Sequence, residues 1–481
     1  MAAGAMAQRH MRFAFLAASF ILHPSLMPFS ETIAAVATPP GESALAIVRA
    51  SGPLVPALAA AVLGRPVTDI PSPRHATFGH YHPLAGESLD QIVLTYYAAP
   101  ASATGEDLLE ISCHGNPLIV RRILDDLFAR GCRPAQPGEF TRTAFLAGKL
   151  DLSQAEAVAD LIRARSEGAL RAARRQLDGE LSRRIQEFSE TLLQIQAEVE
   201  AYIDFPEEDL PAVNSAALRA KISGLVTDIE KLLATTRYGT LLREGASAVI
   251  AGPPNAGKSS LLNALLGRPR AIVSPEPGTT RDFIEERLYI GPYAIQITDT
   301  AGLNLVSQNP IEAEGINRAL EKIANADLLL LVIDSTLPSP ILPKSLLDNI
   351  LSTNTLVLEN KTDLSDSVIH NSFFPECQHV RLSLKTGVGL EALSAMLVSV
   401  LEKSYSIPHE DLILTSVRHS EALTHTKTSL GAALDELTTH APTEILAAHL
   451  RDALESLGTI VGNLDNNAML DHLFASFCIG K

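Results

Sequence analysis

The sequence predicts a multidomain protein of the α+β and α/β classes, in which an α/β nucleotide-binding module interrupts an all-helical domain. Its 481 residues correspond to about three domains at roughly 150 residues each. The residue pattern changes near positions 149, 242 and 407, from short strands to helices, then to a βα alternation, and then back to helices. A glycine-rich string at 252–259 opens the βα alternation. Such a string between a strand and a helix is typical of phosphate binding.

Residues 1–30 form a leader of doubtful status. Arg9 and Arg12 precede the apolar run from Phe13 to Leu22, which suits a signal-peptide core but is too short to span a bilayer. No clear cleavage site follows, and an ordinary domain start comes after Met27. An over-extended start codon is favoured over a targeting segment, with a folded extension in third place.

Charge and cysteine usage limit the class of protein. The formal net charge of −16 excludes nonspecific binding to nucleic acid through overall positive charge, although a local basic patch remains possible. The four cysteines are too few and too scattered for a disulfide framework or a zinc site. A soluble protein of the reducing cytoplasm is expected.

The segment 31–148 reads as a small α+β domain. Short apolar runs occur at 44–49, 91–97 and 108–112, and they are separated by proline and glycine. A helix is expected at 117–130.

Two helical segments flank the α/β module. Alanine, leucine, glutamate and arginine dominate 149–241 and again 407–481, with apolar residues at helical spacing. Insertion is tolerated where domain termini lie close together. We therefore expect the module at 242–406 to be inserted into one helical domain whose two halves pair in space.

The strongest motif is Gly252-Pro-Pro-Asn-Ala-Gly-Lys-Ser259, between an apolar strand and a helix. Only glycine lets backbone N–H groups approach a phosphate chain closely, and the following helix N-terminus adds partial positive charge. This predicts a Walker A loop in which Lys258 reaches the β- and γ-phosphates and the Ser259 hydroxyl binds Mg²⁺.

The string Asn360-Lys361-Thr362-Asp363 follows an apolar strand and indicates the base. The Asp363 carboxylate can accept from the N1–H and the 2-amino group of guanine together, whereas adenine has no such pair of donors. The string Ser383-Leu384-Lys385 after a further strand strengthens the prediction of a GTP site.

Two segments between these motifs suit a γ-phosphate sensor, namely 277–282 and 299–302. Thr280 can complete the Mg²⁺ shell, the Gly302 N–H can bind a γ-oxygen, and Asp299 can hold a metal-bound water. Leu303 stands where Ras-like enzymes carry a water-orienting glutamine. Glu312 and Glu314 are the nearby alternatives.

The flanking segments closely resemble the tRNA-modifying GTPase family MnmE (TrmE). The resemblance is carried by 32–42, by Thr104-Gly-Glu-Asp-Leu-Leu-Glu-Ile-Ser-Cys-His-Gly115, by 137–162 and by the end Phe477-Cys-Ile-Gly-Lys481, and it covers 31–481. It implies a folate-binding N-terminal dimerisation domain at 31–148, a discontinuous helical domain at 149–241 and 407–481, and an inserted Ras-like G domain at 242–406.

The resemblance also implies a function. The family acts as a homodimer with an FAD-containing partner, MnmG (GidA), and forms a 5-aminomethyl or 5-carboxymethylaminomethyl group on the wobble uridine of certain tRNAs. The one-carbon unit comes from 5,10-methylenetetrahydrofolate or a related tetrahydrofolate. GTP hydrolysis is stimulated by K⁺, which takes the place of an arginine finger.

The candidate site residues, taken from the motifs and from the family resemblance, fall into six sets. Glu312 rather than Glu314 matches the water-orienting glutamate. K⁺ is assigned to Asn255, Ser274, Glu276 and Thr279, and Mg²⁺ to Ser259 and Thr280. Folate is assigned to Arg49, Glu110, Lys149 and Lys481, and Cys478 is a possible functional thiol. The GTP site takes in Asn255, Ala256, Gly257, Lys258, Ser259, Ser260, Ser274, Pro275, Glu276, Pro277, Gly278, Thr279, Thr280, Asp299, Thr300, Ala301, Gly302, Asn360, Lys361, Thr362, Asp363, Ser383, Leu384 and Lys385.

Two other functions remain as alternatives. One is a ribosome-assembly or regulatory GTPase switch without modification chemistry, and the other is a membrane-anchored signalling GTPase that retains the run at 13–22. For tRNA binding, the arginine-rich stretch 163–184 could contact phosphates, though a solvated helix face with i,i+4 ion pairs is the more common meaning of such a pattern.

Overall fold

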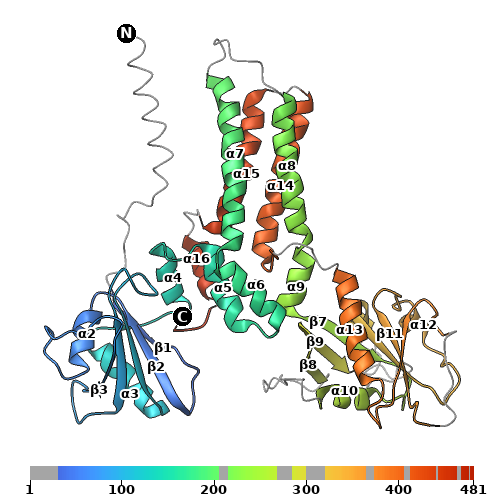
Figure 1. Cartoon of the computed structure of the whole chain (residues 1–481), viewed down its shortest axis with the longest axis horizontal. Helices are drawn as coiled ribbons and strands as arrows, with labels where there is room; N and C mark the ends of the chain where they lie inside the picture. The colour runs from blue at the N-terminus through green and yellow to red at the C-terminus, as the bar shows by residue number, and fades with distance from the viewer. Residues whose placement is uncertain are drawn as a thin grey trace, which may run out of the picture. The chain divides into compact units, whose positions relative to one another are not determined.

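The structure, a computed structural model, describes residues 31–204, 215–267, 284–299, 320–364, 373–405, 412–439, 442–462, 467–475 and 477–480. They form two compact units (Figure 1), one from the described parts of 1–150 and 466–481 and the other from those of 151–465. Among the described residues, no helix combines the length and the apolar character that crossing a membrane requires.

The first unit is built on a six-stranded sheet with the order β3-β4-β5-β2-β1-β6, antiparallel except for the β1–β6 pair. Side chains alternate between its two faces. One face, with Val48, Leu94 and Ile111, is buried under α2 and α3, and the other carries Arg49 and Glu110. The elements are β1 (Ile33–Val36), β2 (Ser43–Ser51), α2 (Val55–Ala61), β3 (Ala76–His80), β4 (Gln91–Tyr97), β5 (Leu108–Gly115), α3 (Pro117–Ala129), β6 (Arg133–Pro134) and α4 (Glu139–Leu146).

The C-terminal end of the chain belongs to this first unit. Helix α16 (Asn467–Ala475) places the Phe474 ring 6.5 Å from that of Phe145 in α4. A Cβ on Gly138 would lie 2.7 Å from the carbonyl of Phe474, so this contact requires glycine there. The expected segment 407–481 is thus divided, since its residues from 467 on pack with the N-terminal domain.

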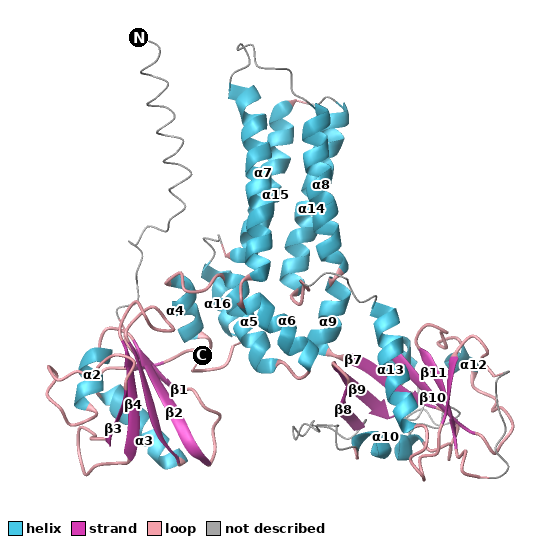
Figure 2. Cartoon of the chain, in the orientation of Figure 1, coloured by secondary structure: helices cyan, strands magenta, loops and turns pink. Residues whose placement is uncertain are grey.

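The second unit begins with a helical bundle that both halves of the helical sequence build (Figure 2). One hydrophobic core joins Ile185 and Leu192 of α7, Ile222 of α8, and Leu430 and Leu450 of α14 and α15. The pairing of the two halves around an inserted module is therefore confirmed. The helices are α5 (Leu152–Arg163), α6 (Glu167–Leu177), α7 (Glu180–Asp204), α8 (Ser215–Ala234), α9 (Thr236–Glu244), α14 (Val417–Thr439) and α15 (Thr443–Val461).

A buried ion-pair network also ties the two helical halves together. Glu156 of α5 accepts from Arg418 Nε at 2.8 Å and lies 2.6 Å from His419 Nε2. Burial alone would raise the pKa of this carboxyl, but the hydrogen bonds and charges of His419 and Arg418 outweigh it and bring the pKa to about 2. Arg418 Nη1 also donates to the Thr459 carbonyl at 2.6 Å, which satisfies a carbonyl in the last turn of α15.

The inserted module is an α/β domain with the sheet order β12-β11-β10-β7-β9-β8, parallel except for the β8–β9 hairpin. Apolar clusters cover both of its faces, which explains the continuous apolar run of β10. The elements are β7 (Ala246–Ala251), α10 (Lys258–Leu266), β8 (Ile284–Ile290), β9 (Tyr293–Asp299), β10 (Leu328–Asp334), α12 (Lys344–Leu347), β11 (Thr355–Asn360), β12 (Gln378–Arg381) and α13 (Leu390–Tyr405).

The points where the chain enters and leaves this module are fastened together. Asp327 accepts from the Ser247 main-chain N–H and hydroxyl, both at 2.8 Å. Its other carboxylate oxygen accepts from the hydroxyl of Tyr405, the last residue of α13. Arg237 of α9 lies over the Tyr405 ring at 5.9 Å.

Candidate functional site

The loop between β7 and α10 has the backbone geometry of a phosphate-binding loop. Gly252 has φ +143° and Gly257 has φ +108°, and Asn255 is also left-handed at φ +61°. A Cβ on Gly252 would lie 2.1 Å from the Val332 carbonyl, and one on Gly257 would lie 2.3 Å from the side chain of Asn360. Both glycines are therefore required, and the N-terminus of α10 opens directly onto the loop.

The Lys258 ammonium lies within this loop. It donates to the carbonyls of Gly252 at 3.0 Å and Pro253 at 2.9 Å. P-loop proteins hold the β- and γ-phosphates at this position. Ser259 follows in the first turn of α10, where its hydroxyl suits Mg²⁺ binding.

A second loop, after β11, is joined to the phosphate loop by Asn360. This buried side chain donates to the Ala256 carbonyl at 2.8 Å and accepts from the Leu384 N–H at 3.2 Å. Lys361, at φ +69°, pairs with Asp334 at 2.5 Å. Three segments that lie far apart in the sequence thus form one site.

The carboxylate of Asp363, the residue expected to recognise the base, is held in place by a hydrogen bond. The Ser383 hydroxyl donates to Asp363 Oδ1 at 2.7 Å. This hydrogen bond is the main reason why the pKa of Asp363 is lowered, with a smaller contribution from the charge of Lys385. A charged, solvent-accessible carboxylate whose second oxygen remains available fits the two adjacent N–H donors of guanine.

Of the segments expected to sense the γ-phosphate, the structure describes only the adjoining ends of strands β8 and β9. Ile284 pairs with Asp299, and Asp299 pairs with Ile250 at the end of β7, so β8 begins and β9 ends at the edge where the phosphate loop begins. Outside the described residues lie Ser274, Pro275, Glu276, Pro277, Gly278, Thr279, Thr280, Thr300, Ala301, Gly302 and Glu312.

In the first unit, the candidate folate residues Arg49 and Glu110 are cross-strand partners in β2 and β5. Arg49 Nη2 lies 2.6 Å from Glu110 Oε1, and Arg49 Nη1 is 3.5 Å from the carbonyl of Gly480. Tyr97 donates weakly to Glu110 Oε2 at 3.4 Å, and burial, followed by the charge of Glu110, raises the pKa of Tyr97.

The other candidates of this unit lie nearby or outside the described residues. A Cβ on Gly105 would lie 3.6 Å from the Lys149 side chain, which places Lys149 beside the Thr104–Glu110 segment. Cys478 is exposed, and its carbonyl accepts from the Gly138 N–H at 3.2 Å. Lys481 lies outside the described residues, although Gly480 brings the chain end to Arg49.

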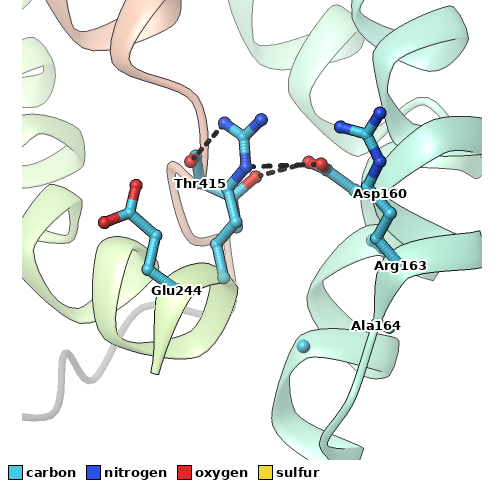
Figure 3. A pocket seen from close by; sticks show the side chains of 8 residues that line it. Asp160, Arg163, Ala164, Glu244 and Thr415 are labelled. Atoms are coloured by element: carbon cyan, nitrogen blue, oxygen red, sulfur yellow. Dashed lines mark hydrogen bonds and ion pairs between the residues drawn. The ribbon is translucent and has the colours of Figure 1, made fainter. Parts of the chain in front are cut away.

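A further cavity of about 160 Å³ lies where α5, α6, α9 and the start of the second helical half meet (Figure 3). Arg243 Nε lies 3.5 Å from Asp160, and Arg243 Nη1 donates to the Thr415 carbonyl at 3.3 Å. Burial raises the pKa of Asp160, and Arg243 partly opposes this shift. The Arg243–Asp160 pair and the hydrogen bond from Arg243 to Thr415 join its walls, so the cavity is a structural junction. Its lining also includes Arg163, Ala164, Ala169, Ala173 and Glu244.

Sequence reasoning missed several of these contacts. The Lys361–Asp334 pair and the Glu156–Arg418–His419 network were not anticipated. Asp334 could have been found from its place at the end of the apolar strand β10, because the carboxyl ends of parallel strands gather at one edge of the sheet. Glu156 gave no comparable signal, since a glutamate in a helical segment is usually solvent-exposed.

Comparison with known proteins shows similarity over nearly the whole chain. A family model described as the MnmE helical domain matches residues 152–478, and one described as the GTP-binding protein TrmE N-terminus matches 32–149. The chain is 50% identical to a tRNA modification GTPase MnmE of Opitutus terrae, over 94% of this chain and 100% of that protein. It is 41% identical to one of Methylococcus capsulatus, over 94% and 99%.

Several solved structures are similar to a part of this chain. The G domain of the T. maritima FeoB iron transporter is 26% identical and covers 32% of this chain and 98% of its own, with a TM-score of 0.25. That score is too low to support an argument.

Proposed function

The chain belongs to the MnmE family of tRNA modification GTPases, and from that premise we propose that it is a K⁺-stimulated GTPase that acts on the wobble uridine of certain tRNAs. It works with the FAD-dependent partner MnmG (GidA) and forms the 5-aminomethyl or 5-carboxymethylaminomethyl group from a tetrahydrofolate one-carbon unit. A homodimer in the cytoplasm is the proposed acting form.

One observation carries the nucleotide part of the proposal. Asn360 binds both the phosphate loop, at Ala256, and the base loop, at Leu384. Ser383 then orients Asp363 toward a base. A nucleotide whose phosphates lie at Lys258 therefore has its guanine edge within reach of Asp363.

The catalytic cations are proposed from the family resemblance, and the donor types are consistent with them. Ser259 and Thr280 would hold Mg²⁺, while Asn255, Ser274, Glu276 and Thr279 would hold K⁺ through amide, carbonyl and hydroxyl oxygens, which hard cations prefer. Asn255 has a positive φ, which bends the loop at that position. A monovalent cation beside the β- and γ-oxygens stabilises developing negative charge. Glu312 then orients the attacking water.

The folate proposal rests on the Arg49–Glu110 pair. Arg49 holds mainly Oε1 of Glu110, while Oε2 has only the 3.4 Å contact from Tyr97. A carboxylate has about four acceptor sites, so Glu110 retains the capacity to accept from the N–H and amino group of a pterin. Lys149 and Lys481 suit the glutamyl tail.

Comparing GTP turnover in K⁺ and in Na⁺ at equal ionic strength tests the cation part. We expect faster hydrolysis in K⁺, and equal rates would contradict a K⁺ site. Calorimetric titration with 5-formyltetrahydrofolate tests the folate part, because Glu110→Gln should abolish most of the heat of binding. A regulatory GTPase without modification chemistry would hydrolyse GTP but bind no folate.

A further inference from the structure

Helix α6 (Glu167–Leu177) has two unlike faces. Its buried face consists of small residues and one amide, Gly168, Ala169, Ala172, Ala173 and Gln176. The opposite face carries Arg171 and Arg174, both exposed. Within each set, residues recur three or four positions apart along the helix, so each set forms one continuous stripe.

The buried face fastens α6 to the inserted G domain. A Cβ on Gly168 would lie 2.6 Å from Leu242 Cδ2 and 3.1 Å from the carbonyl of Pro292 in the β8–β9 turn. Ala172 belongs to the hydrophobic core that includes Leu288 and Tyr293 of that hairpin. At their other end, the strands of the hairpin adjoin 277–282 and 299–302, the segments expected to sense the γ-phosphate.

Both ends of α6 are also fixed by hydrogen bonds. The Ser166 hydroxyl caps the helix by accepting from the Ala169 N–H at 3.1 Å. Near the C-terminus, Gln176 Nε2 donates to the Ser153 carbonyl at 2.8 Å, and Gln154 Nε2 donates to the Leu177 carbonyl at 2.9 Å. The outer face is thus presented by a rigid support, which lowers the entropic cost of binding.

The charge around this face differs from that of the rest of the chain. Seven of the 28 arginines of this acidic protein lie within 163–184, against three acidic residues in the same stretch. Arg174 and Asp178 are 3.7 Å apart, with side chains 77% and 60% exposed, so their pair is worth at most about 1 kcal/mol. Within the described part of the chain, Arg171 has no acidic side chain at ion-pair distance.

We propose that the outer face of α6, defined by Arg171 and Arg174, binds the phosphate backbone of the tRNA substrate. This inference rests on the tRNA substrate of the proposed function. Exposed guanidinium groups on a rigid helix suit phosphate oxygens, which they bind in bidentate fashion. A phosphate backbone on this face lies on the helix that packs against the β8–β9 hairpin, so tRNA binding is mechanically linked to the GTPase module.

The test uses the full-length R171E/R174E variant and a matched control, R121E/R122E. Arg121 lies on α3, is 80% exposed, and faces Asp125 at 3.8 Å with i,i+4 spacing, much as Arg174 faces Asp178. Both variants change the net charge by the same amount. Thermal unfolding and GTP turnover without tRNA should match the unaltered protein in both.

Binding of a tRNA transcript is measured between about 50 and 200 mM KCl. For R171E/R174E we expect affinity at least about tenfold weaker at low salt and a log–log salt slope shallower by about two, one per lost phosphate contact. The control should stay within about twofold of the unaltered protein.

Three outcomes would overturn this assignment. They are equal tRNA affinity of R171E/R174E and its control, an unchanged salt slope, and failure of the unaltered protein to bind tRNA at low salt. In the first of these cases, weakened association with MnmG would assign the face to an acidic protein surface. Loss of the wobble-uridine modification is measured separately. A failure of the proposed function can therefore be distinguished from a failure of the assignment of this face.

Discussion

The side-chain Nδ2 of Asn360 donates a 2.8 Å hydrogen bond to the carbonyl of Ala256, 104 positions earlier in the chain. The same side chain accepts from Leu384 N–H. The phosphate loop and the base loop of the proposed GTP site therefore share one buried amide, and we expect a change at Asn360 to affect both ends of the nucleotide.

Replacing Asn360 with Ala should weaken GTP and GDP binding alike. The substitution removes two hydrogen bonds and leaves the Ala256 carbonyl without its partner, which costs about 1–3 kcal/mol, or roughly 5- to 150-fold in affinity. Titration with fluorescent GTP and GDP analogues measures this. Loss confined to GTP would show that Asn360 acts on the γ-phosphate instead.

Replacing Asp363 with Asn should change the base that is recognised. The Asn amide offers a donor where guanine also donates, but xanthine has a carbonyl there, so GTP affinity should fall about 100-fold or more while XTP affinity rises. Competition between GTP and XTP gives the ratio directly. Ser383→Ala is a milder change, because it removes the orienting hydrogen bond but keeps the carboxylate. It should lower GTP affinity a few-fold without raising XTP affinity.

Replacing Glu312 with Ala should leave GTP binding intact and lower turnover by about 100-fold or more, as expected for losing a water-orienting carboxylate. Glu314→Ala is the matched control, since it removes an equivalent charge two positions away. If Glu314→Ala abolished turnover while Glu312→Ala left it normal, the roles would be reversed.

Replacing Glu156 with Gln should destabilise the helical domain by about 3 kcal/mol at pH 7, because a buried ion-pair network loses its acidic member. The folded-state pKa of about 2 lies below the unfolded value of about 4.3, so this stabilisation is complete above about pH 5 and is lost as the pH falls toward 2. Urea unfolding at several pH values measures the free energy of unfolding of the variant and of the unaltered protein. The difference between the two should narrow by about 1–2 kcal/mol between pH 5 and pH 3.

The control for that experiment is Glu198→Gln. Glu198 pairs with Lys221 at 2.7 Å on the bundle surface, where the two side chains are 31% and 50% exposed. We expect a cost below about 1 kcal/mol. Equal costs at Glu156 and Glu198 would contradict the role assigned to the buried network.

The phosphate loop and the base loop are predictions from local strings, because each string, 252–259 and 360–363, is continuous in the sequence. The insertion of the module also followed from composition alone. The contacts between segments could not be predicted from the sequence, since Asn360 contacts Ala256, and Glu156 contacts Arg418, only after the chain has folded. The packing of Phe474 beside Gly138 was unpredictable for the same reason, as helical periodicity does not say which domain a terminal helix joins.

The most direct test of the central claim is nucleoside analysis of tRNA from a strain that lacks this gene, complemented with either the unaltered gene or Lys258→Ala. Because Lys258 lies in the phosphate loop, the account predicts that the C5 substituent of the wobble uridine disappears on deletion, returns with the unaltered gene and stays absent with Lys258→Ala. An unchanged nucleoside profile after deletion, or full restoration by Lys258→Ala, would contradict it.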